Sequence, residues 1–459
     1  RWLKNGWRNS RGEPVENRDL WEELYILQQE RSVEWIKVKG HSKDAGNDRA
    51  DQLARQACEK QDSLPHAEGQ GNIVKSDRPL KKEAPVNSGG VNKMRKLGIL
   101  TGGGDCPGLN AVIRAVVKGA TYNYDMQVVG FNNGFRGLVE NDAAVITDRA
   151  VSGILNRGGT ILGTSNRDNP FDYRAEGSDY RETGCDRSAD AMENIKKWDI
   201  ECLVVIGGDG SLLLAHRFSE LGLPIIGIPK TIDNDLPATD VTFGFDSAVT
   251  TATEAIDKIH TTAESHHRVM VVEVMGRHAG WIALQAGMAG GGDIILIPEL
   301  PFDYGHIIDK IEERQRRGKK FSIIVVAEGA FPEGGEPLYQ SSGSIKRLGG
   351  IGQLVSEEIE KRTSMESRAT VLGHLQRGGS PTAYDRVLAT RFGVHAVKLF
   401  RSGRYNEMVC LKGNQIESVP LEIAVAGTKR VDPQSEQVRA ALAVGTSFGC
   451  SLTFQNKQI

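Results

Sequence analysis

From residue 94 onward, short runs of apolar residues alternate with longer amphipathic stretches. Runs rich in Val, Ile and Leu occupy residues 97–100, 203–206, 225–228, 269–274, 294–297 and 323–326. Helix-like amphipathic patterns occupy residues 109–121, 211–221, 247–260 and 303–317. Short, nearly continuous apolar runs are typical of strands that are buried on both faces of a parallel sheet. The alternation therefore predicts repeated β-α-β units and a doubly wound α/β fold.

The residues before 94 follow two other patterns. Residues 1–60 are charged, and they hold four of the six tryptophans of the chain, Trp2, Trp7, Trp21 and Trp35. Residues 61–93 contain Pro, Gly and Ser with little apolar periodicity, which is typical of a flexible linker. The sequence therefore predicts a small module over residues 1–60, a linker over 61–93 and the main α/β domain over 94–459.

Composition narrows the classes of function. The formal charge is −2, because 57 Lys and Arg oppose 59 Asp and Glu. This balance argues against a protein that binds mainly nucleic acid or an anionic membrane. No apolar run approaches the roughly 18 residues of a membrane helix, and the six cysteines lie far apart without a Cys-x-x-Cys pair. We therefore expect a cytoplasmic protein with reduced thiols and no membrane segment.

Four loops at the ends of predicted strands carry the candidate chemistry. They are residues 102–108, 157–164, 207–211 and 229–235, and the first three are rich in glycine. At such strand ends, glycine lets the backbone approach a phosphate, and the start of the next helix supplies free N–H groups. None of the loops has the GxxxxGK[ST] or GxGxxG spacing. The loops therefore predict a phosphate-binding scheme other than a P-loop or a dinucleotide fold.

Two acidic groups lie in these loops. Asp209 follows Gly207 and Gly208, where its carboxylate could hold Mg²⁺ against a polyphosphate or could cap the following helix. Asp233 and Asp235 flank Asn234, and this cluster could supply a base that accepts a proton from an attacking hydroxyl. Formation of an Asx turn is the alternative explanation for the cluster.

Several motifs along the main domain resemble those of a single protein family. They occupy residues 100–105, 207–211, 231–235, 275–277 and 373–381, and the similarity runs from Lys96 to the C-terminus. This part of the chain resembles 6-phosphofructokinase. The resemblance implies two doubly wound, three-layer α/β/α subdomains that are interleaved within residues 94–459. It also implies Mg²⁺-dependent transfer of the γ-phosphoryl group of ATP to the 1-hydroxyl of fructose 6-phosphate, which gives fructose 1,6-bisphosphate in glycolysis.

The resemblance assigns site residues by position. Asp233 would be the catalytic base, and Asp209 would bind Mg²⁺. The nucleotide would contact Gly104, Arg167, Asp168, Gly208, Asp209, Gly210 and Ser211. The sugar phosphate would contact Thr231, Ile232, Asp233, Arg268, Met275, Gly276, Arg277, Glu299, Arg368, His374, Leu375, Gln376 and Arg377, with Glu299 on the sugar hydroxyls and Arg268, Arg368, His374 and Arg377 on the 6-phosphate.

The resemblance says less about the phosphoryl donor, the effectors and the oligomeric state. Gly210 is the residue type that accompanies ATP use in the resembled family, whereas Lys230 resembles the pyrophosphate-dependent branch or the longer mixed group, so ATP is predicted and pyrophosphate is the alternative. The effector pocket matches poorly, since Lys118, His260 and Phe321 stand where Arg, Arg and His are expected. The resemblance also implies a homodimer or a homotetramer in which Arg268 and Arg368 reach the sugar site of a neighbouring subunit.

Residues 1–60 resemble the last third of ribonuclease H. The matching motifs lie at residues 2–7, 17–21 and 38–54, and in that family Asp51 would bind a metal and His41 would shuttle protons. Two-metal cleavage needs several converging carboxylates, and the strands that would carry the others are not in this segment. We therefore expect a truncated, partial α/β fragment without nuclease activity. Binding or cleavage of an RNA/DNA hybrid is the rival function.

Overall fold

The computed structural model describes residues 94–174, 184–342 and 345–452. All of these residues belong to one compact unit, Gly90–Ile459. The predictions for the module at residues 1–60 and for the linker at 61–93 lie outside the described residues.

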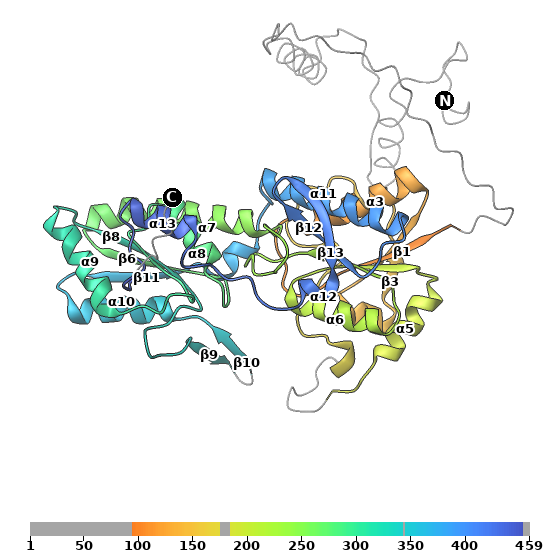
Figure 1. The fold of residues 1–459 in the computed structure, drawn as a ribbon, viewed down its shortest axis with the longest axis horizontal. Helices are drawn as coiled ribbons and strands as arrows, with labels where there is room; N and C mark the ends of the chain where they lie inside the picture. The colour runs from red at the N-terminus through yellow and green to blue at the C-terminus, as the bar shows by residue number, and fades with distance from the viewer. Residues whose placement is uncertain (1–93, 175–183, 343–344, 453–459) are drawn as a thin grey trace, which may run out of the picture. The chain divides into compact units, whose positions relative to one another are not determined.

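The larger sheet begins with the first apolar run of the unit. Its described strands follow the order β13-β12-β5-β4-β1-β2-β3. Figure 1 labels four of them, β13, β12, β1 and β3. Their bounds are β1 Lys96–Thr101, β2 Gln127–Phe131, β3 Ala143–Val145, β4 Cys202–Gly207, β5 Ile225–Pro229, β12 Glu407–Lys412 and β13 Gln415–Pro420. The five inner strands are parallel to one another, whereas β3 and β13 pair antiparallel at the two edges.

The second sheet is parallel throughout and has the order β11-β6-β8-β7. Its strands are β6 Val269–Val274, β7 Ile294–Leu296, β8 Ser322–Ala327 and β11 Ser367–Val371. A separate hairpin consists of β9 Tyr339–Ser342 and β10 Ile345–Leu348. The chain leaves the larger sheet after β5, builds the second sheet, and returns to add β12 and β13. The two sheets are therefore interleaved along the sequence.

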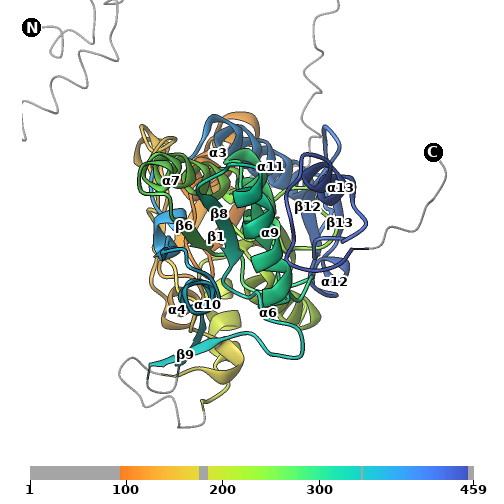
Figure 2. The same ribbon diagram turned by 90° about the vertical axis from the view of Figure 1, so that its left-hand side faces the viewer.

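Most of the described helices lie between consecutive strands, and α12 and α13 follow the last strand. Those described are α3 Leu109–Tyr124, α4 Phe135–Glu140, α5 Ser188–Lys197, α6 Asp209–Glu220, α7 Phe245–His266, α8 Trp281–Ala289, α9 Tyr304–Arg316, α10 Ile351–Arg362, α11 Ala383–Arg401, α12 Leu421–Ala424 and α13 Glu436–Ala443. Short 3₁₀ turns occupy Arg149–Val151, Pro170–Asp172 and Gly373–Arg377, of which the last is labelled η4. Figure 2 shows α3, α7 and α11 on one side of the strands and α4, α6 and α10 on the other.

The period of two along each strand divides the core between these layers. In β1, Ile99 packs on the side of α3 and α11, and the next residue, Leu100, packs on the side of α4 and α6. In β6, Val272 faces α7 and α8, whereas Val271 faces α9 and α10. Both neighbours are fully buried in each case, which explains why these strands have continuous apolar sequences.

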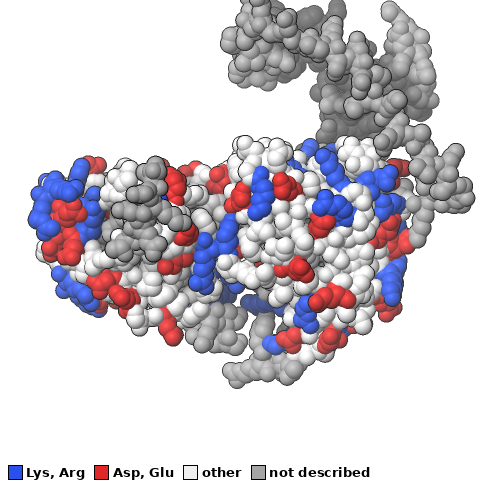
Figure 3. Space-filling model, in the orientation of Figure 1, with Lys and Arg blue, Asp and Glu red and all other residues white. Residues whose placement is uncertain are grey.

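The predicted α/β fold is confirmed, and the six predicted strands and four predicted helices are present. Helix α6 starts at Asp209, two residues before the predicted start, because Gly208 occupies the N-cap position. Within the described ranges, no helix is both long and apolar enough to cross a membrane. Basic and acidic side chains are interspersed on the face shown in Figure 3, in keeping with the small net charge.

Candidate active site

Two glycine loops meet at the start of helix α6. A Cβ atom on Gly207 would lie 2.3 Å from Cβ of Ser211, and one on Gly102 would lie 2.6 Å from Oγ of Ser211. Glycine at both positions therefore leaves room for the side chain of Ser211, so that the loop after β1 can pack against the start of α6. No side chain caps the helix, so the N–H groups of its first turn point out of the helix without intrahelical partners. A phosphate group matches such a helix start in charge and in hydrogen bonding.

Asp209 lies in the first turn of α6 and pairs with Arg277. Nη1 of Arg277 is 3.2 Å from Oδ1 and 3.3 Å from Oδ2 of Asp209. The capping alternative for Asp209 is therefore wrong, because its carboxylate accepts from the guanidinium and not from the helix backbone. The two side chains are about half exposed, at 49% for Arg277 and 53% for Asp209. This carboxylate is accessible to a cation that arrives with a phosphate ligand.

Asp233 is the buried acid of the loop after β5. It is 2% exposed, and its Oδ1 atom has no hydrogen-bond partner among the described residues. Burial raises the pKa of Asp233, and the nearby Glu328 raises it further, while the cations Arg377, Arg277 and Lys230 oppose the shift. A carboxylate that is held close to cations, has a raised pKa and keeps one oxygen available has the properties of a general base.

The turn around Asp233 is built by its neighbours. The backbone N–H of Asp233 donates to Oγ1 of Thr231 at 3.0 Å, and Oδ1 of Asn234 accepts from the backbone N–H of Thr242 at 3.1 Å. Thr231 makes the local turn, so Asp233 does not form the Asx turn that was the alternative explanation. Burial also raises the pKa of Asp235, which the charge on Asp233 raises further.

Lys230 and Arg377 join this loop to the one after β1. The Lys230 ammonium donates to the carbonyl of Gly104 and is 3% exposed, and burial lowers its pKa. Nη1 of Arg377 donates to the carbonyl of Asp105 at 3.2 Å. A Cβ on Gly104 would lie 2.7 Å from the same Nη1 atom, so glycine leaves room for the guanidinium. Two cations therefore stand beside the candidate phosphate loop.

The second sheet contributes a carboxylate that sequence reasoning missed. Glu328 follows β8, and its Oε1 accepts from the backbone N–H of Arg277 at 3.0 Å. Strand β8 pairs directly with β6, which precedes Arg277, whereas β7 lies on the far side of β8. The available signal was the acidic residue two positions after the apolar run at residues 323–326, a position equivalent to the other strand-end loops.

Glu299 was predicted to hold sugar hydroxyls, and the structure gives it other partners. Its Oε1 accepts from the backbone N–H groups of Gly280 at 3.0 Å and Val431 at 2.8 Å, and burial raises its pKa. The Glu299 carboxylate thus fixes two backbone segments. Both acids bond to the loop between β6 and α8, but Glu328 bonds at Arg277 itself, whereas Glu299 bonds at Gly280, three residues further along the chain.

The remaining predicted residues fall into several environments. Gln376 is fully buried and its Oε1 accepts from the backbone N–H of Met275 at 2.9 Å, while Ile232 is buried in the core. These two side chains therefore stabilise the loops at residues 275–277 and 231–235 and do not face the site. Asp168 is held by Arg136, with both oxygens 3.3 Å from guanidinium nitrogens. His374 and Leu375 are exposed at the surface of η4.

Arg268 and Arg368 lie at the opposite end of the second sheet from these loops. Arg268 precedes β6, and Arg368 lies near the amino end of β11, whereas Arg277 follows the carboxyl end of β6. The length of β6 alone is about 20 Å. Both arginines pair with Glu366, and Arg368 also pairs with Glu360 at 2.9 Å. The structure does not bring these two predicted phosphate ligands to the site of their own chain.

The described residues contain no group of three or more His, Cys, Asp and Glu that could enclose a metal ion. Mg²⁺ bound to phosphates needs only one or two protein carboxylates, because waters and phosphate oxygens complete its coordination. The exposed carboxylate of Asp209, beside a helix start that suits phosphate, fits this requirement.

Comparison with known proteins identifies the family. The model for phosphofructokinase matches residues 96–400. The chain belongs to the phosphofructokinase family. The predicted family is thus confirmed for the main part of the chain. A second model, for RNase H, matches residues 1–59, which lie outside the described residues.

Two relatives illustrate the breadth of the phosphofructokinase family. ATP-dependent 6-phosphofructokinase 2 of Clostridium perfringens is 52% identical over 363 residues, which cover 78% of this chain and 99% of the relative. The pyrophosphate–fructose 6-phosphate 1-phosphotransferase of Streptomyces coelicolor is 52% identical over 360 residues, which cover 77% of this chain and 100% of the relative. Overall identity therefore does not distinguish the two donors.

Solved phosphofructokinase structures share the fold. The T-state enzyme of Pichia pastoris superposes with a TM-score of 0.64 at 32% identity, over 81% of this chain and 38% of that one. The pyrophosphate-dependent phosphofructokinase of Nitrosospira multiformis gives a TM-score of 0.65 at 21% identity, over 79% of this chain and 95% of that one. The α/β architecture is thus shared with both solved phosphofructokinases.

Proposed function

We propose that the chain transfers the γ-phosphoryl group of ATP to the 1-hydroxyl of fructose 6-phosphate. The observation that supports this most strongly is the alignment of β4 with β5, in which Gly207 pairs with Pro229. The start of α6, which suits a phosphate, and the loop that carries the buried Asp233 therefore follow neighbouring strands and lie side by side. A phosphoryl donor at the first loop would lie next to a base for the attacking hydroxyl at the second.

Each group then has a role in the transfer. Asp233 accepts the proton of the 1-hydroxyl as the oxygen attacks phosphorus. Arg277, whose charge already acts on Asp233, stabilises the negative charge that spreads over the phosphoryl oxygens, while Arg377 keeps its predicted role at the 6-phosphate of the sugar. Asp209 would hold Mg²⁺, which would supply further neutralisation of the phosphate charge. Glu328, placed behind Arg277, is assigned to the sugar hydroxyls in place of Glu299.

ATP is proposed as the donor because of the space at Gly210. A Cβ at this position would have no neighbour within 4 Å, and the residue is exposed in the first turn of α6. The bare backbone leaves room beside the inner phosphates of a nucleotide. Pyrophosphate is the second candidate, since Lys230 is present and a relative at 52% identity is named for that donor.

The test is to identify the product. The purified chain is incubated with fructose 6-phosphate, ATP and Mg²⁺, and the product is followed by ³¹P nuclear magnetic resonance. We expect fructose 1,6-bisphosphate and ADP in equal amounts from the wild-type chain, and a large loss of rate in Asp233→Ser. Hydrolysis of ATP without sugar phosphorylation, or phosphorylation at another hydroxyl, would contradict the proposal.

A further inference from the structure

The segment after α12 contains a lysine that binds directly to the loop of the proposed base. Nζ of Lys429 donates to Oδ1 of Asn234 at 3.0 Å, to the carbonyl of Thr239 at 2.9 Å and to that of Asp240 at 2.9 Å. An ammonium group has three N–H donors. All three are therefore accounted for by the loop that follows Asp233.

The backbone of Lys429 is fixed at both of its polar groups. Its N–H donates to the carbonyl of Asp235 at 2.7 Å, and its carbonyl accepts from Nε1 of Trp281 at 3.0 Å. The ammonium also lies 5.6 Å from the centre of the Trp281 ring. Trp281 opens helix α8, four residues after Arg277. Lys429 therefore connects the loop of the larger sheet that carries Asp233 to the helix that follows the arginine loop.

Asn234 explains why this contact matters for the base. Its backbone has a φ of +52°, a left-handed conformation that asparagine tolerates better than most non-glycine residues. Two donors hold its side-chain oxygen, the Thr242 N–H at 3.1 Å and the Lys429 ammonium. Asn234 is the next residue after Asp233, so a shift of the Asn234 backbone would also move the backbone that carries the Asp233 side chain.

We propose that Lys429 is a positioning residue for phosphoryl transfer. Its ammonium group holds the loop at residues 231–242 in place and thereby orients the carboxylate of Asp233. The inference rests on the proposed role of Asp233. Lys429 lies beyond residues 96–400, the range that the family model matches. A misdirected base lowers the rate without removing any group that binds substrate, and a displacement of about 1 Å can lower it about 100-fold.

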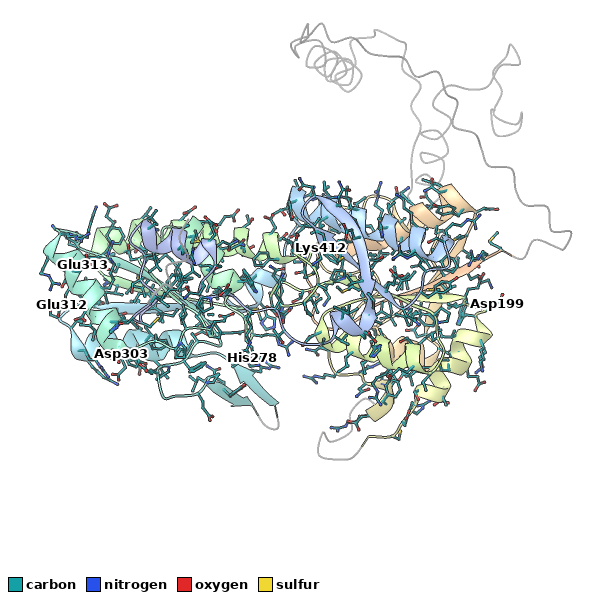
Figure 4. All side chains as sticks on the ribbon, in the orientation of Figure 1. Asp199, His278, Asp303, Glu312, Glu313 and Lys412 are labelled. Carbon is teal, nitrogen blue, oxygen red and sulfur yellow. The ribbon has the colours of Figure 1, made fainter. Side chains whose placement is uncertain are left out.

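The first test is Lys429→Met, which keeps the length of the side chain and removes its donors. We expect kcat to fall about 10- to 100-fold, with KM for fructose 6-phosphate and for ATP within about twofold of wild type. Hydrogen exchange gives a second readout, in which the Thr242 amide becomes less protected. Lys319→Met is the matched control, because Lys319 is an exposed lysine between α9 and β8 and its loss changes the charge equally. Lys412 at the end of β12 (Figure 4) would not serve, because its charge acts on Lys429.

The pH dependence separates this role from a merely structural one. Burial lowers the pKa of Lys429 to about 8, while Asp240 and Asp235 raise it and Lys412 lowers it further. As the pH rises through about 8, the ammonium loses a proton and its hydrogen bonds to the loop weaken, so wild-type kcat should fall. In Lys429→Arg the guanidinium stays charged, and we expect this alkaline decline to move to higher pH even if the maximal rate is lower.

The outcomes are distinguishable. An active wild-type chain with unchanged kcat in Lys429→Met, or an alkaline decline at the same pH in Lys429→Arg, would overturn the role of Lys429 alone. A wild-type chain that does not phosphorylate fructose 6-phosphate would instead overturn the proposed function. If Lys429→Met does not fold, the pH profile of Lys429→Arg still decides the inference.

Discussion

At the scale of single residues, Asp233 combines deep burial with an unpartnered carboxylate oxygen. We predict that Asp233→Ser lowers kcat by roughly 10² to 10⁴, the range found for positioned acid–base groups. Binding of fructose 6-phosphate should be largely retained, because the cations that attract its phosphate are unchanged. Steady-state kinetics with calorimetric titration of the sugar phosphate tests this. A change confined to KM would remove Asp233 from the role of base.

Gly210 allows a clean test of the nucleotide site. Because a side chain at this position meets no atom within 4 Å, Gly210→Asp should fold with a thermal midpoint close to that of wild type. The added negative charge would repel the phosphates of ATP, so we predict a large loss of kcat/KM for ATP. Gly210→Ala is the matched control, since it adds a Cβ atom without charge. Unchanged ATP kinetics in Gly210→Asp would show that the nucleotide binds elsewhere.

Glu328 and Glu299 form a second matched pair of residues. Glu328→Gln should raise KM for fructose 6-phosphate, because a neutral amide accepts the hydrogen bonds of sugar hydroxyls more weakly than a carboxylate does. Glu299→Gln should leave this KM near the wild-type value and lower the thermal midpoint, because Glu299 binds two backbone N–H groups. The reverse pattern in the two variants would return the sugar contact to Glu299.

At the scale of elements, the strands that the sequence predicted are buried on both faces, but burial alone does not separate them from the strands that were missed. The inner strands β2 and β12 are also largely buried, and they were missed because Gly130 interrupts the apolar run of one and Met408 and Cys410 are mixed into the other. The apolar runs at residues 203–206 and 323–326 lie in β4 and β8, which are buried at every position. Strand β11 was missed because it lies at the edge of its sheet and has only one buried residue, Ser367. Strand β13 was missed for the same reason, since it pairs on one side only and has no fully buried residue.

The order of strands also limits what sequence can predict about the site. The loops with Asp209 and Asp233 follow neighbouring strands, so their meeting could be predicted from the β-α-β pattern. The choice between Glu299 and Glu328 depends on β8 lying between β6 and β7, which the order of elements along the chain does not reveal. Lys429 is 195 residues from Asn234, and no local pattern connects them.

At the scale of the whole molecule, Arg268 and Arg368 raise the question of assembly. Both lie at the end of the second sheet opposite the site, where they pair with Glu366. A symmetric oligomer would allow these cations to complete the sugar-phosphate site of a neighbouring subunit. We predict at least a dimer. The measurement is a mixture of the inactive variants Asp233→Ser and Arg268→Ala under conditions of subunit exchange, which should regain activity through hybrid sites. Absence of recovery despite demonstrated exchange would contradict a shared site.

The choice of phosphoryl donor tests the proposed reaction most directly. Initial rates of fructose 1,6-bisphosphate formation are measured with ATP and with pyrophosphate at equal concentrations, with saturating fructose 6-phosphate and Mg²⁺. Because Gly210 leaves the space beside the phosphates open, we predict turnover with ATP and a much lower rate with pyrophosphate. Equal or faster turnover with pyrophosphate, or none with either donor, would contradict an ATP-dependent transfer.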